Sequence, residues 1–466
     1  MFDGDEDLLA NIGKIVGLGA LGATGAYFLG RFLIKSLVSQ AGSKMLSEPY
    51  SENIFETFTS TSRINPIALV ELSMRAQSGK ALERSLGTPY PLPDFSGMRF
   101  KAAQLDRKPV SNEVEVDTTL VLGKKAARPL RLDIPITIGG MAFGLALSRQ
   151  AKLAIAEAAN KVGTAASTGD GPMTDWERAA TDRLIVQYPQ VKWNHDPDLL
   201  RQADLVMIEI GHAAWAGAGG KYGWEELSPE LRRVLGLKRG EPAIYHSRLP
   251  EVSKPRDLRT LVSELRKITE GLPIGVKMAC GDIESDLAIA LEAEADVLAL
   301  DGGQAASHSA PVVIEDNFGI PTVAALCRAS RWLDSQNARD RVSLIVGGGL
   351  SSPGDFLKAI ALGADGVYIG SAALLAMTHT QIFKAVPFEP PTQLVYYTGK
   401  QKNKFNPKDG ARHLANYLRA CVEEMRLATK AIGKTALRDL SRDDLVAIDE
   451  QTAKIAGIPL FYQSPD

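Results

Sequence analysis

From residue 131 onward, short apolar runs alternate with amphipathic segments. The apolar runs predict strands at residues 134–138, 163–167, 184–187, 205–210, 274–278, 297–300, 344–346 and 367–369. Helical spacing of apolar residues between some of these strands predicts helices at residues 149–161, 255–270, 286–294 and 353–362. Strands that alternate with helices are typical of a parallel sheet in an α/β protein. Eight of them predict a (β/α)8 TIM barrel, and a doubly wound open sheet is the alternative.

Residues 15–30, IVGLGALGATGAYFLG, carry no charge and lie between Lys14 and Arg31. A membrane-spanning helix needs about 20 apolar residues, and flanking basic side chains that reach toward the headgroups lengthen such a segment. Acidic residues precede it and basic residues follow it, so the positive-inside rule places the rest of the chain in the cytoplasm. The segment therefore predicts a single amino-terminal helix that anchors the protein to a membrane. The alternatives are a buried or interfacial helix, a signal peptide and, from GLGALG at residues 17–22, a dinucleotide-binding loop.

Three regions follow from these patterns: the amino-terminal segment 1–40, an irregular collar at 41–129 and the barrel at 130–466. Residues 410–434 and 440–456 predict a helical extension at the end of the barrel region. The long insertion at 211–273 follows the fourth strand, on the face of a barrel where active sites are built.

The composition is that of a folded protein without affinity for nucleic acid. The chain has 466 residues, of which 45% are hydrophobic and 23% charged, and its net charge is −2. These values exclude wholesale disorder and a polytopic membrane protein. Cys280, Cys327 and Cys421 are the three cysteines, far apart and without a CxxC pair. A disulfide framework and a four-thiolate cluster are therefore excluded, and no metal site is predicted.

Two glycine-rich strand ends near the end of the barrel predict a phosphate site. Residues 343–349 read SLIVGGG and residues 367–371 read VYIGS. In barrels, the loops after strands seven and eight often bind phosphate through backbone N–H groups and a helix amino terminus. Ordinary tight turns are the alternative explanation. The candidate residues are Gly347, Gly348, Gly349, Gly370 and Ser371.

Other candidates lie at the ends of the remaining strands. Lys277 ends the fifth strand, where a charge is costly to bury without a partner, and a solvent-exposed lysine is the alternative. Small residues at 139–144, 168–171 and 301–307 follow the first, second and sixth strands and would let the backbone approach a flat ring. Together these stretches outline one rim.

Taken in order, PITIGGMAFG at 135–144, STGDG at 167–171, GVKMA at 275–279 and LDGGQAAS at 300–307 resemble the flavin domain of the glutamate synthase family. The GGG and IGS loops follow in that family's order. The resemblance implies FMN in a (β/α)8 barrel and an oxidoreductase that reduces a 2-imino acid, 2-iminoglutarate in that family, to an amino acid. It implies that Lys277 is the catalytic residue beside the ring. The cofactor-binding residues that it implies are Gly139, Gly140, Met141, Lys277, Gly302, Gly303, Gln304, Gly348, Gly349, Gly370 and Ser371.

Departures from the family's pattern bear on cluster, substrate and partners. No cysteine precedes Cys280, so the catalytic cysteine of the family's amino-terminal glutaminase domain has no counterpart here. Residues 376–381 read AMTHTQ where the family has a cysteine-rich loop, and no cysteine follows until Cys421, which argues against a 3Fe–4S cluster. In IEIGHAAWAGAGGK at 208–221, Gly211 and Ala214 stand where the family has lysine and glutamine. Glu209, His212 and Asp301 are then the candidate substrate residues.

These departures keep several functions open. The protein can be a glutamate synthase-type oxidoreductase, a flavin enzyme of the same fold for another amino or hydroxy acid, or a non-catalytic membrane-tethered flavin subunit. Because no glutaminase cysteine and no NAD site beyond the GLGALG stretch at 17–22 is evident, we expect separate proteins to supply ammonia and electrons.

Overall fold

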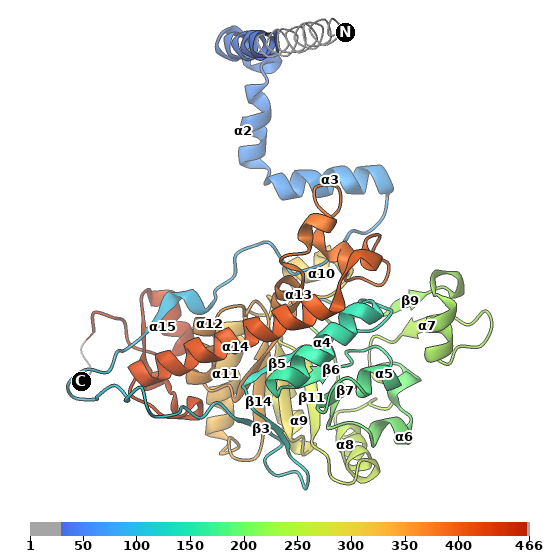
Figure 1. Cartoon of the computed structure of the whole chain (residues 1–466), viewed down its shortest axis with the longest axis vertical. Coiled ribbons are helices and arrows are strands. Elements are labelled where there is room, and N and C mark those ends of the chain that lie inside the picture. The colour runs from blue at the N-terminus through green and yellow to red at the C-terminus, as the bar shows by residue number, and fades with distance from the viewer. Residues whose placement is uncertain (1–28, 464–466) are drawn as a thin grey trace, which may run out of the picture. The chain divides into compact units, whose positions relative to one another are not determined.

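The computed structural model describes residues 29–463 of a chain that divides into two compact units, 1–82 and 83–466. The described part of the first unit is helical over residues 29–47 and continues with η1 (Tyr50–Glu52), α2 (Phe55–Arg63) and α3 (Pro66–Ser78) (Figure 1). Asn65 caps the amino terminus of α3, because its side chain accepts from the Ile67 N–H. Among the described residues of this unit, only Asn53 and Leu82 are buried, so these helices form no apolar core of their own.

The predicted membrane segment lies almost wholly in residues 1–28, outside the described residues, as does the GLGALG stretch at 17–22. Within residues 29–463, no helix is both long and apolar enough to cross a lipid bilayer. The membrane anchor therefore stays a prediction from the sequence.

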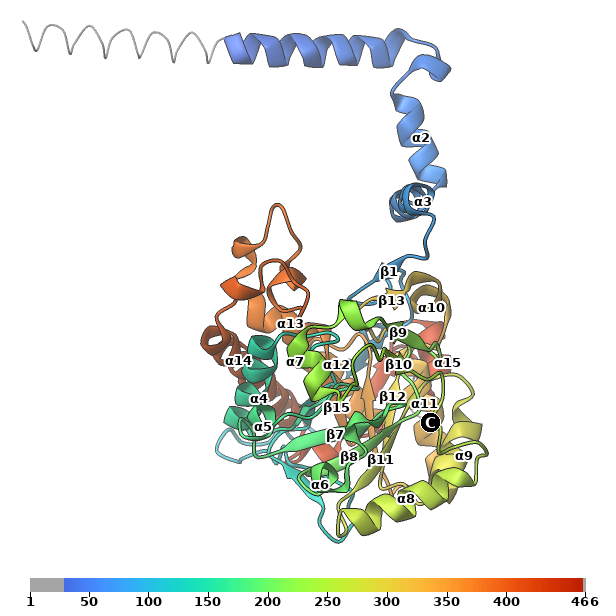
Figure 2. The same cartoon turned by 90° about the vertical axis from the view of Figure 1, so that its right-hand side faces the viewer.

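The second unit is built on an eight-stranded parallel sheet with the order β5-β15-β14-β12-β11-β8-β7-β6. Its two end strands approach each other, because the Ile138 N–H donates to the Ala165 carbonyl at 3.1 Å. The sheet is thus a nearly closed barrel, as predicted, and not an open doubly wound sheet (Figure 2). All eight predicted strands are present. They are β5 (Ile136–Ile138), β6 (Ala166–Ser167), β7 (Leu184–Tyr188), β8 (Leu205–Glu209), β11 (Ile274–Ala279), β12 (Val297–Asp301), β14 (Ser343–Gly347) and β15 (Gly366–Ile369).

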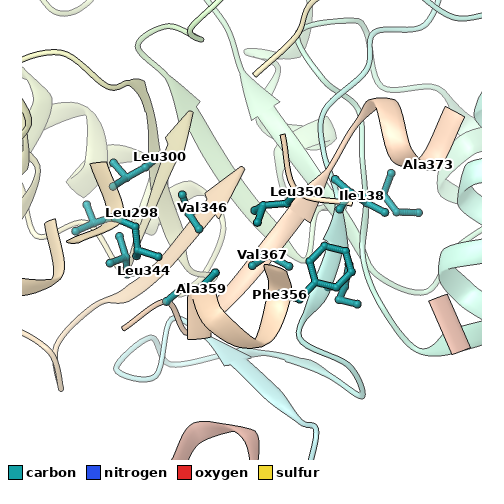
Figure 3. Packing of buried hydrophobic residues seen from close by; sticks show 14 of the residues in the cluster. Ile138, Leu298, Leu300, Leu344, Val346, Leu350, Phe356, Ala359, Val367 and Ala373 are labelled. Carbon is teal, nitrogen blue, oxygen red and sulfur yellow. The ribbon is translucent and has the colours of Figure 1, made fainter. Parts of the chain in front are cut away.

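Helices cover the outside of the barrel, because every second side chain of a strand points outward. Figure 3 shows part of this outer core, in which Val367 lies near Phe356 of α12, and Leu298 and Leu344 belong to the same cluster. The helices are α4 (Arg149–Val162), α5 (Asp175–Arg178), α6 (Pro197–Leu200), α8 (Asp257–Ile268), α9 (Ile283–Glu292), α10 (Val312–Asn317), α11 (Thr322–Ser335), α12 (Pro353–Ala361) and α13 (Ser371–Thr378).

A separate core fills the inside of the barrel at the amino-terminal ends of the strands. The hairpin of β3 (Leu120–Leu122) and β4 (Leu130–Leu132) contributes Leu122 and Leu132 to it, and the strands contribute Leu205, Val297 and Ile345. This hairpin therefore closes one end of the barrel. The opposite end is left for the site.

The carboxy-terminal extension is helical only in part. The helix α14 (Pro407–Ala431) packs along α4 (Figure 1). The predicted helix at 440–456 is wrong in its first half, where β16 (Leu445–Ala447) pairs with β2 (Met98–Phe100), and α15 (Glu450–Ala456) follows. The aspartate before α15 explains this boundary, because the Asp449 side chain accepts from the Thr452 N–H as a helix cap.

Two smaller two-stranded sheets contribute residues to the cavity at the carboxyl ends of the barrel strands. In the insertion, β9 (Gly220–Tyr222) pairs with β10 (Ala243–Tyr245), and α7 (Pro229–Val234) lies between them along the chain. The short strands β1 (Glu83–Arg84) and β13 (Ala310–Pro311) also pair.

Candidate functional site

A cavity of about 760 Å³ opens at the carboxyl ends of the barrel strands. Its volume lies within the range of about 300–1,000 Å³ that is usual for ligand sites. Most of the predicted site residues line it. They are Gly139, Gly140, Met141, Glu209, His212, Lys277, Asp301, Gln304, Gly348, Gly349, Gly370 and Ser371. Gly302 and Gly303 do not line it: both are buried in the wall behind, close to Thr322 and Ile320.

Lys277 lies between two carboxylates at the floor of this cavity. Its Nζ atom is 3.4 Å from Asp301 Oδ2 and 3.7 Å from Glu209 Oε1. The strands impose this arrangement, because Lys277 on β11 pairs in register with Glu209 on β8. Burial opposes the charge of the lysine, but Asp301, Glu209 and Asp170 outweigh it and raise the pKa of Lys277 above its ordinary value. The solvated-lysine alternative is therefore wrong: the amine is held inside the barrel mouth as a cation.

Glu209 contacts several polar side chains of the site. Its side chain is 2% exposed, and it accepts from Gln187 Nε2 at 2.6 Å and bonds to His212 Nδ1 at 2.8 Å. Burial alone would raise the pKa of Glu209, but Lys277 and His212 together lower it to about 2. Glu209 is thus a carboxylate at neutral pH.

His212 connects this carboxylate to a serine from a different loop. Its Nε2 atom lies 3.1 Å from Ser307 Oγ, and Ser307 also lines the cavity. Burial lowers the pKa of the imidazole, whereas the hydrogen bond and the charge of Glu209 raise it, and the net direction is upward. The side chain of His212 therefore favours the charged form.

Three further residues of the site were not named as candidates from the sequence, although Asp170 lies in the stretch 168–171 that was predicted to form part of the rim. Tyr368 on β15 donates its hydroxyl hydrogen to Asp301, and burial raises the pKa of Tyr368 well above its ordinary value. Burial, followed by the charge of Glu209, raises the pKa of Asp170, which lies in the turn after β6. Gln187 on β7 is the third. Gln187 could have been predicted from the sequence, because Ile185 and Gln187 occupy alternate positions of the same strand and therefore share one face.

The predicted phosphate loops present free backbone donors to the cavity. Within residues 29–463, the N–H groups of Gly349, Gly370 and Ser371 donate no hydrogen bond, and the helix α13 begins at Ser371. Gly349 has a φ of +73°, and a Cβ there would lie 2.9 Å from the Gln304 Cβ, so glycine is required. A Cβ at Gly370 would meet no atom within 4 Å. Unpaired donors at a helix amino terminus are suited to an anion.

The charges around the cavity are mainly acidic. Five acidic residues line it, Glu83, Asp170, Glu209, Glu226 and Asp301, against two lysines, Lys221 and Lys277. No arginine is among the described residues that line it. The cavity thus lacks the bidentate arginine pairs that often bind carboxylates.

None of the three cysteines lines the cavity, although the Cys280 N–H donates to the Asp301 carbonyl at 3.0 Å. Cys280, Cys327 and Cys421 are buried free thiols, and burial raises the pKa of each. In the part of the chain that the structure describes, no group of three or more His, Cys, Asp or Glu side chains is placed to hold a metal ion.

The fold and the cavity define a parallel (β/α)8-barrel protein with a ligand-sized cavity at the carboxyl ends of its strands. The chain belongs to the glutamate synthase family, because the model of the conserved region in glutamate synthase matches residues 97–435. A glutamate synthase large subunit-like protein of Rhizobium meliloti (strain 1021) is 34% identical over 411 residues, which cover 84% of this chain and 93% of the relative. An archaeal-type glutamate synthase (NADPH) of Thermotoga maritima is 29% identical over 420 residues, which cover 84% and 83%.

A solved structure of a mutant flavocytochrome b2 with benzoylformate has a TM-score of 0.50 to this chain and 17% sequence identity. The match covers 82% of this chain and 86% of that one. At this identity the likeness supports the barrel fold and nothing further.

Proposed function

We propose that this protein is an FMN-dependent oxidoreductase that reduces a 2-imino acid to an amino acid. The carrying observation is that one cavity combines free backbone donors at Gly349, Gly370 and Ser371 with a fixed cation at Lys277. Membership of the glutamate synthase family supports the same reaction class. Its first candidate substrate is 2-iminoglutarate, formed from 2-oxoglutarate and ammonia.

The residues present fit FMN. The free N–H groups at the start of α13 would hold its phosphate, and Gly139, Gly140 and Met141 would lie beside its ring. A Cβ at Gly140 would lie 2.1 Å from Gln187 Oε1, so this loop admits only glycine where it passes the barrel mouth. When bound, FMN supplies the hydride that reduces the substrate carbon. Lys277 would stabilise negative charge on the reduced ring.

A second substrate class is supported by the charges of the cavity. A dicarboxylate is typically bound by a cationic partner for each carboxylate. Of the two lysines that line the cavity, Lys277 is already shared between Asp301 and Glu209, Lys221 is exposed, and no arginine is among the described lining residues. A 2-oxo or amino acid with a single carboxylate suits this cavity better than 2-oxoglutarate does. The proposed reaction stays the same.

An absorbance spectrum and a reoxidation screen test the proposed function. Pure protein should show an oxidised flavin spectrum, and denaturation should release FMN. After anaerobic reduction, a mixture of a 2-oxo acid and ammonium should reoxidise the flavin, whereas either component alone should not. The screen compares 2-oxoglutarate with monocarboxylic 2-oxo acids. A colourless protein that binds no added FMN, or a reduced flavin that no mixture reoxidises, would refute the proposal.

We also propose that the segment 15–30 attaches the protein to a membrane, with the barrel in the cytoplasm and with separate proteins supplying electrons and ammonia. The support is the uncharged run between Lys14 and Arg31 and its charge asymmetry. Deletion of residues 1–40 should move the protein from the membrane fraction to the soluble fraction with its flavin retained. Full-length protein that is soluble without detergent would contradict the anchor.

A further inference from the structure

Glu209, His212 and Ser307 form a continuous chain of hydrogen bonds that ends in the cavity. The distances are 2.8 Å from Glu209 Oε1 to His212 Nδ1 and 3.1 Å from His212 Nε2 to Ser307 Oγ. The three residues come from the end of β8, the insertion after it and the loop after β12. Because both ring nitrogens of His212 are engaged, the imidazole is the link of this chain and not its end.

The first residue of the chain is held rigidly. Glu209 is almost fully buried and receives a second hydrogen bond from Gln187 and the charge of Lys277. Its carboxylate fixes the hydrogen of the imidazole on Nδ1 and stabilises the charged ring. The charged and titratable groups that act on His212 are Glu209, Lys277 and Asp170, and their sum with burial raises the pKa of His212.

The last residue of the chain is left with a hydrogen to donate. In the charged form of His212, Nε2–H donates to Ser307 Oγ, so the hydroxyl hydrogen of Ser307 must point to another acceptor. Ser307 lines the cavity and lies 95 residues from His212 in the sequence. A substrate nitrogen in the cavity is an acceptor of the required kind.

We propose that Glu209, His212 and Ser307 form a proton relay to the substrate, in which the hydroxyl of Ser307 protonates the imine nitrogen. This inference rests on the proposed function. It makes Ser307 a catalytic residue, with His212 as its proton source and Glu209 as the positioning residue.

The step balances in atoms and electrons. The π bond of the C=N group breaks, the hydride of the reduced cofactor forms the new C–H bond, and the proton of Ser307 Oγ forms the new N–H bond. Ser307 regains a proton from His212 Nε2, and neutral His212 regains its own from water. The imine is thereby reduced by two electrons, and the cofactor is oxidised by two.

The first test follows the titration of His212 by NMR and needs no catalytic turnover. Full-length holoprotein labelled with ¹⁵N-histidine contains six histidines, and the His212→Asn variant identifies the His212 signal by its loss. The His212 ring should titrate above its ordinary value of 6.5. Glu209→Gln should shift that titration to lower pH, and Ser307→Ala should change the Nε2 signal alone. A His212 ring that titrates at its ordinary value in all these proteins would overturn the relay.

The second test measures the reoxidation of reduced flavin by the 2-oxo acid and ammonium mixture. General acids typically contribute about 10²- to 10⁴-fold to rate, so Ser307→Ala should slow this step by at least about tenfold with its flavin content unchanged. Ser307→Thr keeps the hydroxyl and should restore most of the rate. Ser335→Ala is the matched control, because Ser335 is exposed on α11 and does not line the cavity, and its rate should equal that of the wild type.

The two tests separate the possible failures. Wild-type rates in Ser307→Ala, at normal flavin content, would exclude the relay and leave the proposed function intact. If no mixture reoxidises the wild-type flavin, the proposed function fails. The histidine titration then decides whether the hydrogen-bonded chain exists.

Discussion

The same strands form both ends of the barrel interior, but the inward-facing side chains at the two ends differ in polarity. At the amino-terminal ends, inward positions are apolar, as at Leu205 and Val297, and the β3–β4 hairpin covers them. At the carboxyl ends of the same two strands, the inward positions are Glu209 and Asp301. Side chains alternate between the two faces of a strand, so every second residue of these strands points into the barrel. Inward residues that are apolar at one end of a strand and acidic at the other therefore give one barrel a hydrophobic end and a charged end.

The comparison indicates where stability and chemistry are located. The apolar end buries hydrocarbon side chains, and their removal from water stabilises the folded protein through the hydrophobic effect. The charged end brings together Lys277, Glu209, Asp301 and Asp170, whose burial costs free energy that only their mutual contacts offset. Charged groups that are buried in spite of this free-energy cost are typical of a functional site.

Lys277→Met should have the largest effect, because it leaves Glu209 and Asp301 without their shared cation. Removal of one partner from a buried ion pair costs about 3–5 kcal/mol in the free energy of unfolding. The flavin that remains bound should have a midpoint potential lower by about 30–65 mV, since a charged hydrogen bond is worth about 1.5–3 kcal/mol and 30 mV equals about 1.4 kcal/mol. Urea unfolding and spectroelectrochemical titration measure the two quantities.

The double variant Lys277→Met with Glu209→Gln is the control for this prediction. It removes one of the two carboxylates that the single change leaves unpaired, so part of the lost stability should return. The potential should stay low, because the cation is still absent. An unchanged potential in Lys277→Met would remove the lysine from the flavin site.

Leu132→Ala tests the apolar end. Leu132 is 1% exposed and packs in the hairpin plug, and leucine-to-alanine changes in cores cost about 2–5 kcal/mol. The midpoint potential of the flavin should stay at its wild-type value, because the cavity lies at the other end of the barrel. A shift of the potential comparable to that of Lys277→Met would show that the two ends are not independent.

Much of this arrangement could be predicted from the sequence. All eight strands were, because their apolar runs are distinct, and the strand ends at Lys277 and Asp301 identified the mouth. Tyr368 was missed because a tyrosine within VYIGS looks like core, and only the barrel shows that it faces Asp301. The contact of His212 with Ser307 could not be predicted, because two loops 95 residues apart meet only when the barrel closes.

Acid should weaken the charged end selectively. The pKa of Glu209 is lowered from 4.5 to about 2 in the folded protein, so its contribution is fully present above pH 4.5 and is lost as the pH falls toward 2. That difference corresponds to about 3 kcal/mol at neutral pH. The stability gap between the wild type and Glu209→Gln should therefore narrow between pH 4.5 and the lowest pH at which both proteins stay folded. A gap that is constant with pH would mean that the carboxylate gains nothing from Lys277 and His212.

Gly370→Ala should have the smallest effect on stability and still alter the mouth. A Cβ at this position meets no protein atom within 4 Å, so the free energy of unfolding of the FMN-free protein should stay within about 0.5 kcal/mol of the wild type. If the FMN phosphate lies against the free N–H groups of Gly370 and Ser371, the same methyl group meets the phosphate. The dissociation constant for FMN should then rise at least about tenfold, which is about 1.4 kcal/mol.

Gly348→Asp is a weaker probe of the same loops, because Gly348 has a φ of +120° and a Cβ there would lie 2.7 Å from Thr322 Oγ1. Loss of FMN from that variant could follow from strain in the apoprotein alone, whereas Gly370→Ala separates the two causes. Titration of the FMN-free protein with FMN, followed by flavin fluorescence, measures the affinity, and urea unfolding without FMN measures the stability. Unchanged affinity in a stably folded Gly370→Ala variant would show that the FMN phosphate does not bind at Gly370 and Ser371.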